Sequence, residues 1–330
     1  MKAWILTPQS RHRWQIFKRH RRGYLSLWII SNDQPLLVYY QGGYYFPLVK
    51  VYPETVFGGD FATETDFRDP YILNKLRNNN NWVLFPLNPH RFDSINTELT
   101  RPAPSPPDAQ NLLGTDDRAR DVLARLIYGF RISVLFAMAL TAIGTLLAVL
   151  IGAIQGYFGG RIDLFFQRFI EIWGSLPELY LLIIFAGIFN PSIGLLVVLL
   201  SLFGWMGLAD YVRAEFLRAR NMVYVKAARA MGVPDSTIMF HHLLPNALTP
   251  VITFLPFRIS GTILALTSLD FLGLGVPPST PSLGELLRQG KGNIDAWWLS
   301  ISAFAVLVIL LLLLNFIGEA LRDAMDPRQE

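Results

Sequence analysis

The chain has 330 residues, of which 52% are hydrophobic and 16% charged, and its mean hydropathy is +0.34. Soluble domains carry about 25% charged residues, so this composition argues against a soluble globular protein. The chain has no cysteine, which excludes disulfides and cysteine-ligated metal sites, and its five histidines show no spacing that suggests zinc. The net charge of +4 is small and the basic residues flank apolar runs, so we expect no nucleic acid partner.

The N-terminal third of the chain divides into two predicted regions. Residues 11–22 form a basic cluster, which the positive-inside rule places in the cytoplasm. The apolar piece Tyr24 to Ile30 is too short to cross about 30 Å of hydrocarbon. We therefore interpret residues 1–30 as a basic cytoplasmic N-terminus with a truncated first span. Residues 31–111 are aromatic and rich in turn residues, with some strand character, and we interpret them as a small extracytoplasmic insertion.

The rest of the chain alternates apolar runs with short polar loops. A membrane span needs about 20 mostly apolar residues, and the run LVILLLLLNFIG has no polar face for water. Residues 121–133 predict an amphipathic helix at the membrane interface. Five runs qualify as spans, which predicts an all-α polytopic membrane protein: 132–157, 166–189, 192–208, 251–269 and 298–317.

The placement of basic residues predicts the orientation of these spans. The loop between the third and fourth spans is basic and is therefore expected in the cytoplasm; it carries Arg213, Arg218, Arg220, Lys226 and Arg229. Alternation then places residues 31–130 and the loop after the fourth span outside. That placement conflicts with a cytoplasmic N-terminus unless a span lies between them. We favour the hypothesis that part of the first span is missing after Ile30.

The sequence shows no recognisable catalytic constellation. An enzyme needs a nucleophile with a base, paired carboxylates or a metal site, and none occurs at a recognisable spacing. The stretch GELLRQGKG resembles a phosphate-binding loop, but its glycines are one residue too far apart, and Gly292 replaces the required Ser or Thr after Lys291. We interpret it as a polar loop and the chain as non-catalytic.

Charged residues inside or near the spans have two interpretations. They are Glu171, Glu178, Asp210, Arg258 and Asp270. In the first interpretation, the carboxylates form the proton relay of a secondary transporter or channel. In the second, the charged residues pair with neighbours near helix ends, where long side chains reach the interface. We favour the second, because most of them lie within two turns of a predicted end.

The cytoplasmic loop AARAMGVPDSTIMFHHLLPNALTP predicts two short helices with a fixed break. Residues 224–231 favour a helix, and Gly232 suits a left-handed position after its end. Pro234 begins the next element, which Asp235 or Ser236 can cap. The second helix, residues 237–243, is expected to end at Pro245. A helix this short is marginal alone in water, so it must pack against the chain's own spans or in a partner's groove.

The same loop resembles a known motif. Lys226-Ala227-Ala228, Gly232 and Leu244-Pro245 have the spacing of the EAA loop of binding-protein-dependent ABC importer permeases, with Lys226 for Glu and His242 for Ile. The resemblance implies that the second helix is a coupling helix, which docks in a cleft of a cytoplasmic ABC ATPase. The candidate ATPase-coupling residues are Ala227, Ala228, Gly232, Asp235, Ile238, Met239, Leu243, Leu244 and Pro245.

Further blocks extend the resemblance to the dipeptide and oligopeptide permeases. These blocks are Leu113-Gly114-Thr115-Asp116, Arg120-Asp121-Val122-Leu123, residues 128–133, Gly156-Tyr157-Phe158-Gly159-Gly160 with Asp163, Arg168 and Pro177, and residues 269–278. The tyrosine-rich insertion and the closing GEALRDAMDP are most similar to Yej-type peptide and microcin permeases. The family has a full first span after Gly23-Tyr24, of which only LSLWII is present here.

The resemblance also implies an architecture and a set of partners. Residues 112–330 would form a type I ABC importer transmembrane domain, with a coupling loop at 211–247, in the bacterial inner membrane. The chain would be one permease subunit of an ATP-driven peptide importer. Its partners would be a sister permease, a cytoplasmic ABC ATPase, a periplasmic substrate-binding protein and membrane lipid. ATP and Mg would bind the ATPase subunits and no cofactor would bind this chain.

Two other functions remain open from the residues alone. One is a secondary transporter or channel that uses the intramembrane carboxylates, which would show proton-driven uptake without an ATPase. The other is a non-transporting membrane sensor or assembly protein, with residues 31–111 as its binding module. That protein would show no flux with any partner. The sequence leaves the substrate itself undefined.

Overall fold

The computed structural model describes residues 34–47, 50–67, 69–77, 81–86, 88–97, 99, 101–189 and 192–325. The chain divides into two compact units, Met1–Arg131 and Ile132–Glu330. The predicted basic N-terminus and truncated first span, residues 1–30, lie outside the described residues.

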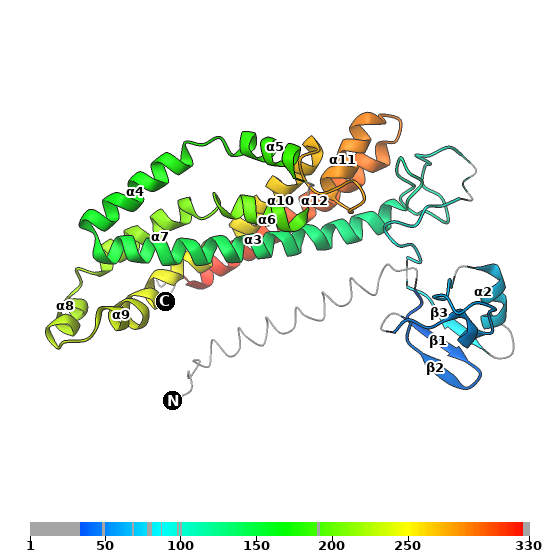
Figure 1. Cartoon of the computed structure of the whole chain (residues 1–330), viewed down its shortest axis with the longest axis horizontal. Helices are drawn as coiled ribbons and strands as arrows, with labels where there is room; N and C mark the ends of the chain where they lie inside the picture. Colours follow the sequence, from blue (N-terminus) through cyan, green and yellow to red (C-terminus); the bar gives the residue numbers. More distant parts are fainter. Residues whose placement is uncertain are drawn as a thin grey trace. The chain divides into compact units, whose positions relative to one another are not determined.

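The first unit contains a three-stranded antiparallel sheet of order β2-β1-β3, drawn in blue in Figure 1. Its strands are β1 (Leu37–Tyr40), β2 (Gly43–Tyr45) and β3 (Trp82–Leu84), and Val38 pairs with Tyr45 on one side and Val83 on the other. Gln41 and Gly42 both have positive φ, as a type I′ hairpin turn requires. The strand character predicted for this region is confirmed.

Aromatic residues form the core of this sheet region. The 3₁₀ helix η1 (Glu54–Phe57) places Phe57 against the rings of Tyr40, Tyr45, Tyr52 and Phe67, mostly edge to face. The helix α2 (Pro70–Arg77), which the sequence reading did not predict, adds Ile72 and Leu76 to the same core. The aromatic-rich composition therefore serves packing in this small unit.

A buried charge network precedes the first long helix. Asp116 pairs with Arg120, with its Oδ2 2.6 Å from Nη2, and with Arg125 at 3.4 Å. Asp121 accepts hydrogen bonds from Asn88 and Asn111 and caps the next helix by accepting from the Ala124 backbone N–H at 2.8 Å. The Asp and Arg residues of this block therefore position the start of that helix.

The rest of the chain is helical. The helices after this network are α3 (Val122–Phe158), α4 (Gly160–Gly174), α5 (Glu178–Ile188), α6 (Ile193–Ser201), α7 (Met206–Ala219), α8 (Val223–Ala230), α9 (Asp235–Thr237), the π-helical segment η2 (Ile238–Leu243), α10 (Leu244–Leu272), α11 (Leu283–Gly292) and α12 (Trp297–Met325). Among the described residues, three helices are long and apolar enough to cross a membrane, or five spans if each of two bent pairs counts as one. These correspond to the five predicted spans.

The structure corrects the predicted spans in two places. Residues 121–133 do not form a separate interface helix, because Val122 is the first residue of α3. The runs 166–189 and 192–208 are not straight spans: α4 and α5 meet at 64°, and α6 and α7 at 40°. The first break falls at Ser175-Leu176-Pro177, where proline supplies no backbone donor and disfavours a helical residue before it.

The long helices of the second unit run alongside one another, so its loops gather at two ends (Figure 1). One end carries α8 and α9, the turn at Gly159-Gly160 and the end of α12; we call it the α8–α9 end. The opposite end carries α11. The stretch containing α11 was expected as a polar loop, but it is helical. Ser282 caps this helix, since its side chain accepts a hydrogen bond from the Glu285 N–H at 3.3 Å.

Candidate functional site

The segment between α7 and α10 contains the predicted coupling residues. Helix α8 ends in a Schellman motif: the Gly232 N–H donates to the Arg229 carbonyl at 2.9 Å, and the Val233 N–H donates to the Ala228 carbonyl at 3.1 Å. Gly232 has φ +77°, so its predicted left-handed conformation is confirmed. The glycine is required here because a side chain disfavours this backbone conformation.

The second helix differs from its prediction. It begins at Asp235 and does not end at Pro245, because α9, the π-helical segment η2 and α10 follow one another without a break. Pro245 lies in the first turn of α10, directly after η2. The wider π turn moves the preceding carbonyls away from the proline ring, and the first turn of a helix tolerates the missing N–H.

The capping prediction is also wrong. The residue before α9 is Pro234, and no side chain caps this helix start. Asp235 is the first helical residue, and its carboxylate instead accepts a hydrogen bond from the Tyr157 hydroxyl. It also lies 3.6 Å from the Arg229 Nε.

Burial bears on the predicted docking contacts. Ile238, Met239 and Leu243 are buried in the chain's own core, where they pack in one cluster with Val225 and Phe216. They therefore offer no exposed surface to a partner's groove, and their role in ATPase coupling stays a prediction. The physical reason is that η2 continues the span, so its apolar face turns inward with the face of α10.

The other candidates differ in exposure. Ala228 is buried against the same core, and Leu244 is half-buried. Ala227, Gly232, Asp235 and Pro245 are exposed. The structure therefore places these four on the outer surface of the segment and the apolar candidates inside it.

Several large apolar side chains outside the candidate coupling residues are exposed at this end, and three of them stand out. They are Val223 (83% exposed), Met231 (76%) and Phe240 (49%). They come from the start of α8, its C-cap and η2. Val223 and Met231 lie outside the candidate spans, where large exposed apolar side chains mark an interaction surface, whereas Phe240 lies near the start of the candidate span Asp235–Leu272. Their exposure could be found only once the inward face of the segment was known.

Tyr157 anchors this segment to the end of α3. Besides its hydrogen bond to Asp235, its ring lies 4.9 Å from the Arg229 guanidinium, which stacks over it. The backbone carbonyl of Tyr157 accepts from Arg220 Nη1 at 3.3 Å. The hydrogen bond with Tyr157 raises the pKa of Arg229, which lies outside the spans. The cluster therefore joins α3, α8 and α9 through charge-assisted contacts.

Two glycines bring α3 against α7 above this anchor. A Cβ on Gly152 would lie 2.5 Å from the Ala209 carbonyl oxygen, and one on Gly156 would lie 2.4 Å from the Phe216 Cβ. Small residues allow this close approach of two helix backbones. An ion pair from Arg213 of α7 to Asp163 of α4, at 2.5 Å and 2.7 Å, joins the third helix. The packing and this ion pair thus join α3, α4 and α7.

The intramembrane carboxylates have separate surroundings. Glu171 pairs with Arg168 at 2.5 Å, and Glu178 lies at the start of α5, where it lines an apolar cavity of about 250 Å³. Asp270 is buried and accepts hydrogen bonds from the Ser282 hydroxyl and, at 2.8 Å, from the Val276 N–H. Asp270 thus fixes the loop between α10 and α11, as expected for pairing near a helix end.

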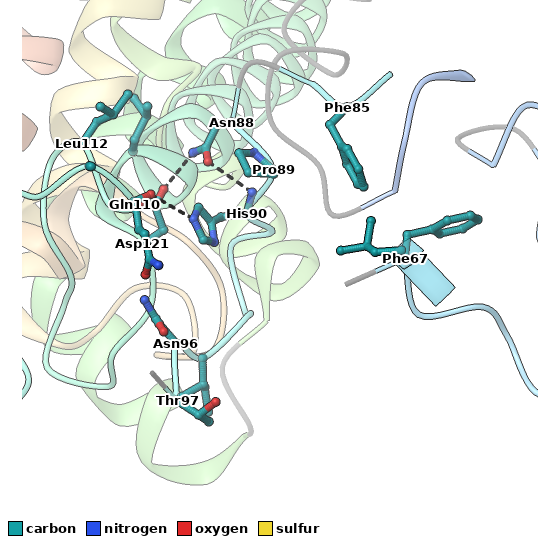
Figure 2. Close-up of a pocket in the computed structure, with 14 residues that line it drawn as sticks. Phe67, Phe85, Asn88, Pro89, His90, Asn96, Thr97, Gln110, Leu112 and Asp121 are labelled. Carbon is teal, nitrogen blue, oxygen red and sulfur yellow. Dashed lines mark hydrogen bonds between the residues drawn. The ribbon is translucent and has the colours of Figure 1, made fainter. Parts of the chain in front are cut away.

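A larger cavity lies in the first unit and is shown in Figure 2. It has a volume of about 650 Å³ and is lined by residues that include Phe67, Phe85 and Asn88. Its polar side chains bind one another: Asn88 donates to Asp121 at 2.7 Å, and the His90 Nε2 lies 3.1 Å from the Gln110 carbonyl oxygen. These contacts serve the structure of the unit. In the part of the chain that the structure describes, no group of His, Cys, Asp or Glu could hold a metal ion.

The apolar helices that are long enough to cross a membrane define a polytopic membrane protein. Residues 144–330 match the family described as binding-protein-dependent transport system inner membrane component. The chain belongs to this family. It is an ABC importer permease and a multi-pass protein of the inner membrane, as the resemblance implied.

Relatives extend this similarity over nearly the whole chain. The inner membrane ABC transporter permease protein YejE of Escherichia coli K12 is 51% identical over 98% of each chain. The peptidoglycan transport system permease protein YejE of Agrobacterium fabrum is 48% identical over 98% of this chain and 94% of its own length. The oligopeptide transport system permease protein OppC of Haemophilus influenzae is 35% identical over 73% of this chain and 77% of its own.

A solved structure supports the fold. The MetNI methionine ABC transporter, in an inward-facing conformation, contains a chain with a TM-score of 0.51 and 20% identity. The match covers 62% of this chain and 97% of that one. The type I importer fold implied by the EAA-like loop is therefore confirmed for the helical part of the chain.

Proposed function

We propose that the chain is the permease subunit through which an ATP-driven importer moves peptides or peptide-like compounds across the inner membrane. The relatives named above include an oligopeptide permease and a peptidoglycan transport permease, and peptidoglycan contains peptide stems. In this proposal the subunit itself performs no covalent chemistry. It pairs with a sister permease and receives substrate from a periplasmic binding protein.

The α8–α9 segment is the proposed contact with a cytoplasmic ABC ATPase. The observation that carries the proposal is the combination of exposed Met231 and Phe240 with a rigid attachment of the same segment to α3. An ATPase that binds these side chains can move α8 and α9 together as a rigid body. The hydrogen bond of Asp235 to Tyr157 passes that movement to a membrane-spanning helix.

ATP supplies the work by binding one global state of the complex more tightly than the other. A ligand shifts a conformational equilibrium only by its differential affinity for the two states. ATP and Mg would bind the ATPase subunits, where closure of the nucleotide sites would shift the permease pair between inward-facing and outward-facing states. The role of this chain is to transmit that shift.

Reconstitution of the complete complex tests the proposal. Proteoliposomes would contain this chain, a sister permease and the ATPase, with the binding protein and a labelled pool of short peptides supplied on the opposite face. We expect uptake with ATP and none with ADP. Proton-driven uptake without the ATPase would favour a secondary transporter. No flux under any condition, with a fully assembled complex, would favour a sensor or assembly protein.

A further inference from the structure

An arginine lies at the centre of a membrane span. Arg258 is the middle residue of α10, which runs from Leu244 to Leu272. It is half-buried, and its Nη2 donates to the Gly204 carbonyl at 2.7 Å, in the break between α6 and α7. Its Nε is buried and has no hydrogen-bond partner among the described residues. No carboxylate pairs with it in the part of the chain that the structure describes.

A charge at this depth needs a polar environment. Ionisable side chains within spans face the bundle interior or a water-filled cavity, because lipid cannot solvate them. The guanidinium has five N–H donors, and a single backbone carbonyl cannot satisfy them. A group that completes the binding of Arg258 must be a hydrogen-bond acceptor, best a carboxylate.

The surface around Arg258 has space for a ligand. On α10 the exposed stripe that contains Arg258 continues with Phe254 on one side and Gly261 and Ala265 on the other. A Cβ on Gly261 would meet no atom within 4 Å. The missing side chain leaves open space one turn along α10 from Arg258, whose guanidinium lies between Gly204 and Gly144 of α3.

The neighbouring helix α7 presents a matching stripe. Gly207 is exposed and its Cβ position is also empty to 4 Å. One turn further, the Tyr211 ring packs on Phe254, with centroids 5.3 Å apart. The two stripes thus form one surface. It carries the cation of Arg258, the exposed rings of Tyr211 and Phe254, and open space at the two glycines. Binding sites for small molecules combine an apolar lining with few polar groups in this way.

We propose that Arg258 binds a carboxylate of the transported peptide at the middle of the membrane. The inference rests on the proposed function and adds a substrate contact to it. The guanidinium fork matches the two oxygens of a carboxylate. The Gly204 carbonyl holds the guanidinium beside the break between α6 and α7, so a bend of these helices would move the bound carboxylate. The aromatic pair Tyr211 and Phe254 would contact the apolar part of the peptide.

The test compares a pool of tripeptides and tetrapeptides with the same pool carrying C-terminal amides. Uptake into proteoliposomes is measured by mass spectrometry and normalised to the affinity of each pool for the binding protein. The wild-type complex should import the free-acid pool better than the amidated pool. In Arg258→Gln, uptake of the free-acid pool should fall about tenfold or more, the effect of losing a hydrogen-bonded charge, while the amidated pool changes little. Arg258→Lys should retain part of the preference.

The control variant is Arg322→Gln, which removes a basic residue from the last turn of α12. It should import both pools as the wild type does. An equal fall of both pools in an assembled Arg258→Gln complex would overturn the proposal and indicate a carboxylate of the sister subunit. If Arg258→Gln fails to assemble, the wild-type comparison decides: equal normalised uptake of both pools overturns the proposal. Failure of the wild type to import either pool would contradict the proposed function itself.

Discussion

Tyr157 and Asp235 lie 78 residues apart in the sequence, and the hydroxyl of the first donates a hydrogen bond to the carboxylate of the second. The contact joins the end of a membrane-spanning helix, α3, to the first residue of α9. Arg229 approaches both partners, lying 3.6 Å from the Asp235 carboxylate and stacking on the Tyr157 ring. The segment of α8 and α9 is therefore attached to this span by polar contacts as well as by packing.

Tyr157→Phe should weaken coupling without preventing assembly. The substitution removes the hydroxyl's hydrogen bonds to Asp235 and Arg229, each worth about 1.5–3 kcal/mol because the partner is charged, and keeps the ring under Arg229. We expect less peptide imported per ATP hydrolysed, with a normal amount of complex in the membrane. Uptake and ATP hydrolysis measured on the same proteoliposomes give this ratio. Arg218→Gln is the matched control, because its exposed pair with Glu215 contributes little. An unchanged ratio in Tyr157→Phe would remove these hydrogen bonds from the coupling route.

Gly232→Asp should release the ATPase. A side chain at φ +77° costs roughly 1 kcal/mol or more, and the aspartate adds a charge at the proposed docking surface. A Cβ at Gly232 meets no atom within 4 Å, so the core of this chain is not crowded. We therefore expect a normal membrane level, lost co-purification of the ATPase and no uptake. Gly232→Asn, which tolerates the left-handed region better, should retain most binding. A Gly232→Asp complex that keeps its ATPase and its uptake would contradict the assignment.

Met231 and Ile238 should respond in different ways. Met231→Asp changes an exposed side chain, so we expect loss of ATPase co-purification with an unchanged melting temperature of the purified subunit. Ile238→Ala creates a cavity in the core and should destabilise the chain by about 2–5 kcal/mol, lowering its membrane level. The measurements are membrane level, melting temperature and ATPase recovery. If Ile238→Ala is fully stable but loses the ATPase, Ile238 contacts the ATPase, and the expectation that its role is only structural is contradicted.

Substitutions of Asp270 and Glu178 distinguish ATP-driven transport from proton-driven transport. Asp270→Asn keeps an acceptor for the Val276 N–H, and Glu178→Gln keeps the size of the side chain, so ATP-dependent uptake should largely remain. Asp270→Ala leaves the Ser282 hydroxyl and the Val276 N–H without that acceptor, at about 1–3 kcal/mol, and should lower the membrane level. If neutral Asp270→Asn or Glu178→Gln abolishes uptake in a normally assembled complex that binds the ATPase, a proton relay becomes the better account.

The sequence predicted the features that depend on local residue chemistry. Gly232 was assigned its left-handed conformation because glycine followed a helical run and preceded Pro234, and the structure shows that conformation. The apolar runs also predicted the positions of the spans, because hydrophobicity over about 20 residues is a property of the local sequence. The S-x-x-E pattern at Ser282 to Glu285 is a capping signal and also predicts the start of α11.

The features that depend on distant contacts were missed or reversed. The apolar face of residues 238–243 was visible, but periodicity does not say whether the chain or a partner buries that face. In the structure, Ile238 is buried in the chain's own core and Phe240 is exposed. The bond between Tyr157 and Asp235 leaves no local pattern. The bend after Gly174 does have a local signal in Pro177, and α4 before it carries several charged residues, but the prediction of one straight span rested on overall apolarity alone.

Cross-linking from the α8–α9 end tests the central claim most directly. The chain has no cysteine, so Met231→Cys provides a single site in it for a photoreactive maleimide. Ile294→Cys is the matched control, because Ile294 is 85% exposed beside α11 at the opposite end of the helical unit. In membranes that contain the whole complex, irradiation should join the ATPase to the Met231 probe and not to the Ile294 probe, and prior removal of the ATPase should abolish the product. A Met231 probe that stays uncrosslinked in a complex that still imports peptide, or an Ile294 probe that captures the ATPase, would contradict the account.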